Sequence, residues 1–204
     1  MDATDALGPL KKVTAVTTDC AAEAIAKLTG QQVTTTVSTV RLVAIEEVLA
    51  EIGDITSVTS VVVVKIGGDM HGLLFLALNP GDARSITKDT IKQTLTQTYI
   101  DQDLNVLCEM TNIIAGAMLN SLSQLLDLRL EQSPPAGTTD ILGAALDPFL
   151  AEFGTKFDKV LVQKEVFSIP AQGSSLKLLA IIDPPSTDRI LQKIKADSQN
   201  ATNY

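Results

Sequence analysis

The sequence carries the same order of segments twice, and this internal repeat limits the folds open to the chain. Residues 48–53 read VLAEIG and residues 149–154 read FLAEFG. LLFLALNP at 73–80 likewise matches LKLLAIIDP at 176–184. Domain boundaries normally fall in Pro-, Gly- or polar-rich linkers, and no such linker separates the two copies. The repeat therefore predicts one domain with pseudo-twofold symmetry rather than two independent domains.

Each copy is predicted to contain a long helix, a strand, a short helix, a hairpin of two strands and a closing helix. In the first copy, about residues 8–102, these elements are expected at 9–28, 31–45, 46–54, 57–80 and 81–97. In the second copy, about residues 103–196, they are expected at 103–126, 128–135, 138–154, 159–185 and 186–196. Pro148 is expected to break the short helix, because proline lacks the N–H that a helix interior uses.

The predicted fold is therefore α/β (α+β), a single domain over residues 1–204 with a continuous β-sheet. The two long helices are expected to pack together on one side of that sheet. Residues 197–204 are expected to form a flexible tail.

Composition excludes several classes of function. The chain has a net charge of −8, which disfavours nucleic acid and anionic membranes as partners. One histidine and two separated cysteines make a zinc site or a Cys–His nucleophile pair a poor expectation. The N-terminus MDATDALGPL carries acids where a signal peptide needs basic residues, and no stretch has the length of a spanning helix. We therefore expect a cytoplasmic protein without a metal or cofactor of its own.

The helix expected at 103–126 has two contrasting faces. One is an apolar stripe that predicts contact with the core; it contains Leu107, Ile114, Met118, Leu122 and Leu125. The other is a polar stripe that contains Asn105, Glu109, Asn112, Gly116, Asn120 and Ser123. Asn and Gly are poor helix formers compared with alanine, by roughly 0.5–1 kcal/mol each. On the pattern alone, a solvated face and a functional face both remain open.

The segment LCEMTNIIAGAMLNSLSQLL at 107–126 resembles the hallmark helix of the CheC/CheX/FliY family of CheY-phosphate phosphatases. The family pattern is Asp or Ser, three residues, Glu, two residues and Asn, often followed by Ile-x-Ala-Gly. Glu109 and Asn112 match the pattern, whereas Asn105 departs from it at the first position. The resemblance extends over essentially the whole chain and implies an internally duplicated, CheC-like fold.

The first long helix resembles the same motif after it has lost its functional residues. The positions of Lys12 and Ala15 correspond to those of Glu109 and Asn112, so a carboxylate has become a cation and the amide is absent. The resemblance therefore implies a single active site, in the second copy. The length of the chain resembles the CheC type, and the flagellar-switch segment of FliY proteins is not found.

By resemblance, the substrate is the aspartyl phosphate of the response regulator CheY. Asn112 is expected to orient the attacking water, and Glu109 to pair with the active-site lysine of CheY. Mg²⁺ is expected to be held by the CheY partner. Asn105 and Gly116 are expected to contact that partner beside the catalytic pair.

A second partner, the receptor deamidase CheD, is implied for the short helix expected at 138–154. Asp140 and the apolar residues around Leu146 are the candidates for this contact. Packing of the same segment on its own sheet explains the pattern equally well. Two further alternatives remain for the whole chain: a non-catalytic adaptor that binds phosphorylated CheY or CheD, and a structural flagellar-switch subunit.

Overall fold

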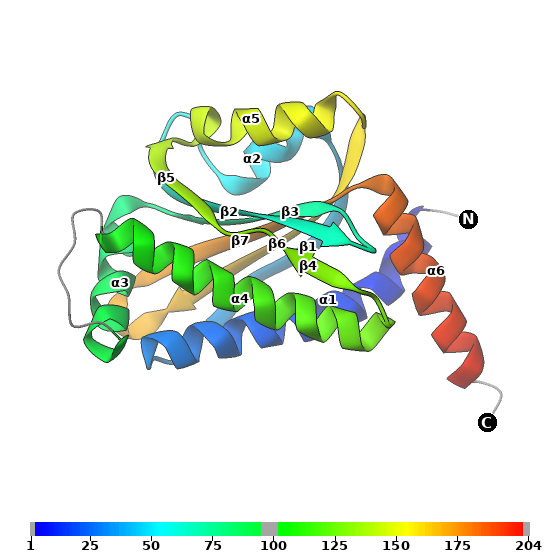
Figure 1. Ribbon diagram of the computed structural model, residues 1–204, viewed down its shortest axis with the longest axis horizontal. Helices are drawn as coiled ribbons and strands as arrows, with labels where there is room; N and C mark the ends of the chain where they lie inside the picture. Colours follow the sequence, from blue (N-terminus) through cyan, green and yellow to red (C-terminus); the bar gives the residue numbers. More distant parts are fainter. Residues whose placement is uncertain (1–2, 95–101, 202–204) are drawn as a thin grey trace.

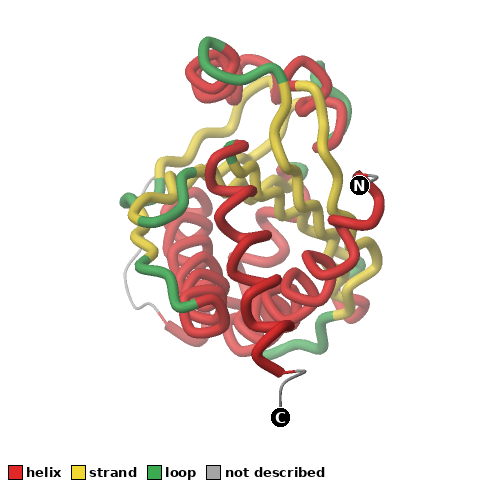
Figure 2. The backbone as a smooth tube through the Cα atoms, turned by 90° about the vertical axis from the view of Figure 1, so that its right-hand side faces the viewer, coloured by secondary structure: helices red, strands yellow, loops and turns green. Residues whose placement is uncertain are grey.

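The computed structural model describes residues 3–94 and 102–201. It consists of one β-sheet between two layers of helices (Figures 1 and 2). The elements in order are α1 (Ala3–Thr29), β1 (Thr34–Ala44), the 3₁₀ helix η1 (Ile45–Glu47), α2 (Val48–Ile52), β2 (Val58–Gly68), β3 (Gly72–Leu78), α3 (Pro80–Thr94), α4 (Gln102–Leu126), β4 (Leu130–Gln132), β5 (Ala136–Ile141), α5 (Leu142–Gly154), β6 (Lys159–Ile169), the 3₁₀ helix η2 (Pro170–Gln172), β7 (Ser174–Ile182) and α6 (Pro184–Ala201).

The two long helices α1 and α4 lie side by side on one face of the sheet and run in opposite directions (Figure 1). The shorter helices α2 and α5 cover the opposite face, and α3 and α6 lie at the two ends. The position of α1 and α4 confirms the prediction that the two long helices pack together on one side of the sheet. No helix in the described part of the chain combines the length and apolar character needed to cross a bilayer.

The sheet joins strands from both halves of the chain. Within the described residues, the strand order is β1-β6-β7-β3-β2-β4, with β5 also paired to β2, and every pairing is antiparallel. This order is symmetric about the β3–β7 pair. The first strand of each copy therefore pairs with the hairpin of the other copy, so neither copy can complete its sheet alone.

The core has two parts, one on each face of the sheet. Val62, Val64 and Ile66 of β2 point toward α1 and α4, whereas Val61 and Val63 point toward α2 and α5. Because both faces are covered by helices, the central strands need no polar side. This explains the continuous apolar run of β2, which does not alternate as a half-exposed strand would.

Three predicted elements differ from the structure. Residues 138–141 lie in strand β5, not in the short helix, because β5 pairs with β2 along its whole length. Pro148 does not end α5, which continues to Gly154. A proline in a helix leaves the main-chain carbonyl four residues earlier without its hydrogen-bond donor. Here that carbonyl belongs to Ala144, which is exposed, so water can donate to it instead. Helix α6 continues to Ala201, so residues 197–201 of the expected tail are helical.

Other boundaries also differ from the predictions or lie outside the described residues. The first long helix begins at Ala3, not at Pro9. The strand expected at 128–135 is reduced to β4, Leu130–Gln132. Residues 95–97 of the fifth predicted element and 202–204 of the predicted tail are outside the described residues. Leu125 was expected in the core-facing stripe of α4 but is 44% exposed.

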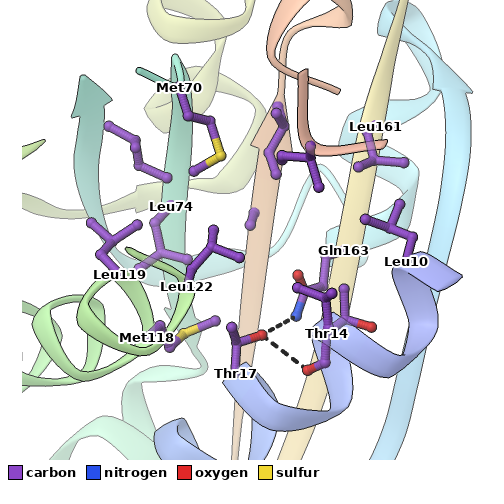
Figure 3. Close-up of a pocket in the computed structure, with 15 residues that line it drawn as sticks. Leu10, Thr14, Thr17, Met70, Leu74, Met118, Leu119, Leu122, Leu161 and Gln163 are labelled. Atoms are coloured by element: carbon purple, nitrogen blue, oxygen red, sulfur yellow. Dashed lines mark hydrogen bonds between the residues drawn. The ribbon is translucent and has the colours of Figure 1, made fainter. Parts of the chain in front are cut away.

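A buried polar cluster connects α1 to the sheet. Thr18 donates from its hydroxyl to Glu165 Oε1 at 2.6 Å, and the Gln163 amide donates to the same oxygen. The Gln163 amide also donates to Thr17 Oγ1 at 3.2 Å, beside an otherwise apolar cavity of about 40 Å³ (Figure 3). Glu165 is fully buried, and its Oε2 has no hydrogen-bond partner among the described residues.

This burial predicts a dependence of stability on pH. Burial raises the pKa of Glu165 above its ordinary value of 4.5, although the hydrogen bonds from Thr18 and Gln163 act in the opposite direction. The folded protein therefore binds this proton more tightly than the unfolded chain. The resulting stabilisation is complete below pH 4.5 and is lost as the pH rises through the raised pKa.

Replacing Glu165 with glutamine removes this titration. The free energy of unfolding of the native chain, minus that of Glu165→Gln, is expected to fall as the pH rises above 4.5 and then to level off. Urea unfolding of both proteins between pH 4.5 and about pH 8 measures this difference. A difference that stays constant over this range would show that Glu165 titrates normally.

Candidate functional site

Helix α4 carries the predicted catalytic residues on the side that faces away from the core. Its buried side includes Leu107, Met110 and Ile114, which pack against the sheet. Glu109 is exposed, and its carboxylate has no hydrogen-bond or ion-pair partner among the described residues. Asn112, one helical turn later, is half-buried. The two side chains therefore lie on neighbouring parts of one face, as the spacing predicted.

Of the two other residues predicted on this helix, one faces solvent and the other lies near strand β4. Asn105 is exposed, whereas Gly116 is half-buried. Ile113 is 40% exposed between them, which places an apolar side chain next to the polar pair. On the adjacent helix α1, Lys12 and Ala15 are exposed as well. At these two positions α1 therefore has neither the carboxylate nor the amide that α4 carries.

Asn112 has a partner that the sequence did not predict. Gln132 of β4 donates from Nε2 to Asn112 Oδ1 at 2.6 Å and to the main-chain oxygen of Asn112 at 3.2 Å. Gln132 Oε1 is buried without a hydrogen-bond partner among the described residues. It lies 3.9 Å from the position that a Cβ on Gly116 would occupy. The predicted notch at Gly116 therefore lies beside the Gln132 amide.

Close packing of α4 against the edge of the sheet brings β4 within reach of Asn112. At Gly137 in β5, a Cβ would lie 2.9 Å from both Cys108 Sγ and Leu104 Cδ1. Only glycine allows the helix to approach the strand this closely. β4 precedes β5 and pairs with the far part of β2, so it runs under the middle of α4.

The residues proposed for a second partner are separated from this site. Asp140 is exposed at the end of β5, and its Oδ1 accepts a hydrogen bond from the N–H of Ile141 at 2.7 Å. Leu146 is 0% exposed and belongs to the core between α5 and the sheet. Asp140 is therefore accessible to another protein, whereas Leu146 is not.

The chemistry available at α4 is that of one carboxylate and one neutral amide. The described residues contain no group of three His, Cys, Asp or Glu that could hold a metal ion. An amide can accept and donate hydrogen bonds without a change of charge, so it can orient a water molecule. An exposed carboxylate can pair with a cation on a second protein, and the pair gains strength when the interface excludes water.

Part of the chain matches the model of a known protein family. Residues 60–140, from β2 to β5, match the family model described as "Chemotaxis phosphatase CheX". Glu109, Asn112 and Gln132 all lie in this segment. Comparison with curated proteins finds no match.

Solved structures share the fold over most of their length. FliY from Thermotoga maritima is 20% identical, with a TM-score of 0.62 over 86% of this chain and 88% of that one. CheX from Desulfovibrio desulfuricans is 13% identical, with a TM-score of 0.58 over 84% of this chain and 99% of that one. FliM in the FliM–SpeE complex from H. pylori is 13% identical, with a TM-score of 0.63 over 96% of this chain and 97% of that one. The chain therefore has the fold of FliY, CheX and FliM, and the segment that matches the CheX family model contains Glu109 and Asn112.

Proposed function

We propose that this chain is a cytoplasmic phosphatase of chemotaxis that hydrolyses the aspartyl phosphate of a phosphorylated CheY-type response regulator. One observation carries the proposal: Glu109 and Asn112 lie one turn apart on the outer side of α4, inside the segment that matches the CheX family model. The duplicated architecture and the altered first helix favour the CheC type within this group of proteins.

In this proposal, most of the chemistry resides on the regulator. An acyl phosphate is reactive, and the regulator supplies the Mg²⁺ and the lysine that surround the phosphoryl group. The remaining requirement is a water molecule held in line with the breaking P–O bond. Asn112 meets it as an amide that orients water, the role that a glutamine has in GTPases. Holding a reactant in attack geometry can lower a barrier by several kcal/mol.

Glu109 has a different role, because it docks the helix on the regulator. Its carboxylate has no partner among the described residues, so it is open to pair with the regulator's lysine. An exposed ion pair contributes roughly 0–1 kcal/mol, whereas one shielded by an interface contributes more. Glu109 therefore acts on binding and, through the register of the helix, on hydrolysis.

The test is the decay of a CheY-type regulator phosphorylated with acetyl phosphate, with and without this chain. Faster decay with the chain is expected. Glu109→Ala is expected to weaken binding by about tenfold, equivalent to about 1.4 kcal/mol, and to slow hydrolysis as well. Glu47→Ala is the control, because Glu47 is an exposed glutamate on η1, which precedes α2 on the opposite face.

Two alternatives are separated by the same experiment. The bond between Asn112 Oδ1 and Gln132 favours a non-catalytic adaptor, in which Asn112 only anchors α4 to β4. Binding of the phosphorylated regulator without faster decay would support that adaptor. The fold shared with FliM favours a structural switch subunit. Faster decay that depends on Glu109 and Asn112 would contradict a purely structural role. A contact between CheD and Asp140 is a further proposal, and a pull-down of CheD that survives Asp140→Lys would contradict it.

A further inference from the structure

Gln132 is the one described side chain that holds the amide of Asn112. Its Nε2 lies 2.6 Å from Asn112 Oδ1 and 3.2 Å from the main-chain oxygen of the same residue. The contact joins strand β4 to the middle of helix α4, at the residue to which water orientation is assigned. Gln132 and Asn112 are both half-buried.

The double contact decides which end of each amide faces the other. The main-chain oxygen of Asn112 can only accept a hydrogen bond, so the Gln132 group that faces it must be the NH₂. Asn112 must then turn its oxygen, not its nitrogen, toward the same NH₂. An isolated asparagine amide has no such preference, because its two ends are similar in shape and can exchange by a half-turn.

We propose that Gln132 is a positioning residue for Asn112. Gln132 fixes the side-chain amide of Asn112 so that one lone pair of Asn112 Oδ1 remains open to the attacking water. The inference rests on the proposed phosphatase function and adds to it a residue outside the helix motif. A water that attacks phosphorus points its own lone pair at the phosphoryl group and directs its hydrogens away from it. It therefore needs an oxygen acceptor, and an Asn112 amide rotated by a half-turn would present N–H instead.

The surroundings of Gln132 suit this role. Its Oε1 has no hydrogen-bond partner among the described residues although it is buried, so the residue does not hold its place through a second anchor. Gly116 leaves room for this oxygen, since a Cβ there would be 3.9 Å away, at ordinary contact distance. The polar bonds that Gln132 makes from its side chain are thus both directed to Asn112.

The test replaces Gln132 with methionine, which has a similar length and shape but cannot donate a hydrogen bond. Gln132→Met is expected to lower kcat for the phosphorylated regulator by about tenfold and to leave KM within about twofold, because docking through Glu109 is unchanged. Gln132→Glu keeps the size and, as a carboxylate, cannot donate either, so it is expected to lose a similar share of kcat. Gln124→Met is the matched control, since Gln124 is an exposed glutamine on α4, the helix that carries Asn112.

A second readout does not depend on activity. The {¹H}–¹⁵N heteronuclear NOE of the Asn112 side-chain amide is expected to be high in the native chain and clearly lower in Gln132→Met. A native kcat in both Gln132 variants, together with loss of activity in Asn112→Ala, would overturn the positioning role and leave the phosphatase function intact. An unchanged heteronuclear NOE in Gln132→Met would overturn it as well. If the native chain does not accelerate dephosphorylation at all, the proposed function fails, and the role of Gln132 in hydrolysis fails with it.

Discussion

Asn112→Ala is expected to lower the rate of hydrolysis of a phosphorylated CheY-type regulator by about 100-fold or more. The reason is that the amide is the only group on this part of α4 suited to hold a water molecule, since Glu109 is assigned to docking. Binding is expected to change by less than about threefold, because the exposed Glu109 and Ile113 remain in place. Single-turnover decay of the phosphorylated regulator and a separate binding titration measure the two quantities.

Asn112→Ala is expected to stay folded, so unfolding would not account for its loss of activity. Without the Asn112 side chain, Gln132 Nε2 keeps its bond to the main-chain oxygen of residue 112. The expected loss of stability is therefore only about 1 kcal/mol, the usual contribution of one hydrogen bond. Gln124→Ala, an exposed truncation on the same helix, is expected to retain full activity. Undiminished hydrolysis by Asn112→Ala would show that the water is oriented by another group.

Periodicity predicted the parts of the fold in which burial repeats regularly along the chain. The two long helices α1 and α4 have an apolar stripe, and the hairpins β2–β3 and β6–β7 have apolar runs between turn residues. Their order and their repetition were enough to predict a continuous sheet with both long helices on one side. The relation between the copies also follows from the sequence, because the same pattern occurs twice.

Short elements at the edge of the sheet were not predictable in this way. β5 has no buried residue, so its sequence carries no apolar alternation, and only pairing with β2 makes it a strand. β4 is a three-residue strand, too short for a period. Gln132 lies in it, and nothing in the sequence connects Gln132 to Asn112 across 20 residues. A residue that acts through tertiary contact is visible only after the fold is known.

The two long helices also differ in a way that their sequences only partly showed. α4 rests on apolar side chains of β2, whereas α1 is joined to β6 by the hydrogen bonds of Thr18, Gln163 and Glu165. The loss of Glu and Asn from α1 was predicted, but the polar contact beneath it was not. This contact ties α1 to the sheet by directional bonds inside the core, whereas the Gln132–Asn112 bonds tie α4 to the edge strand β4.

Leu146→Ala is expected to destabilise the protein by 2–5 kcal/mol, the range observed for truncation of a fully buried leucine. Leu146 is 0% exposed in the core between α5 and the sheet, where neighbouring side chains can close the cavity only in part. Because single domains are stable by only about 5–15 kcal/mol, this is a large fraction of the total. Urea unfolding followed by circular dichroism measures the change.

This prediction separates the two interpretations of the segment 138–154. If α5 existed mainly to bind a partner, Leu146→Ala would weaken that complex and leave the free chain nearly as stable as before. Ile141→Ala is the control, because Ile141 is an apolar residue at the end of β5, directly before α5, and is 47% exposed. Its truncation is expected to change stability by less than about 1 kcal/mol. Asp140→Lys, at an exposed position, is expected to change it by less than about 0.5 kcal/mol. A partner that docks here must therefore use exposed residues of the segment, such as Asp140 and Ile141, since Leu146 is buried in the chain's own core.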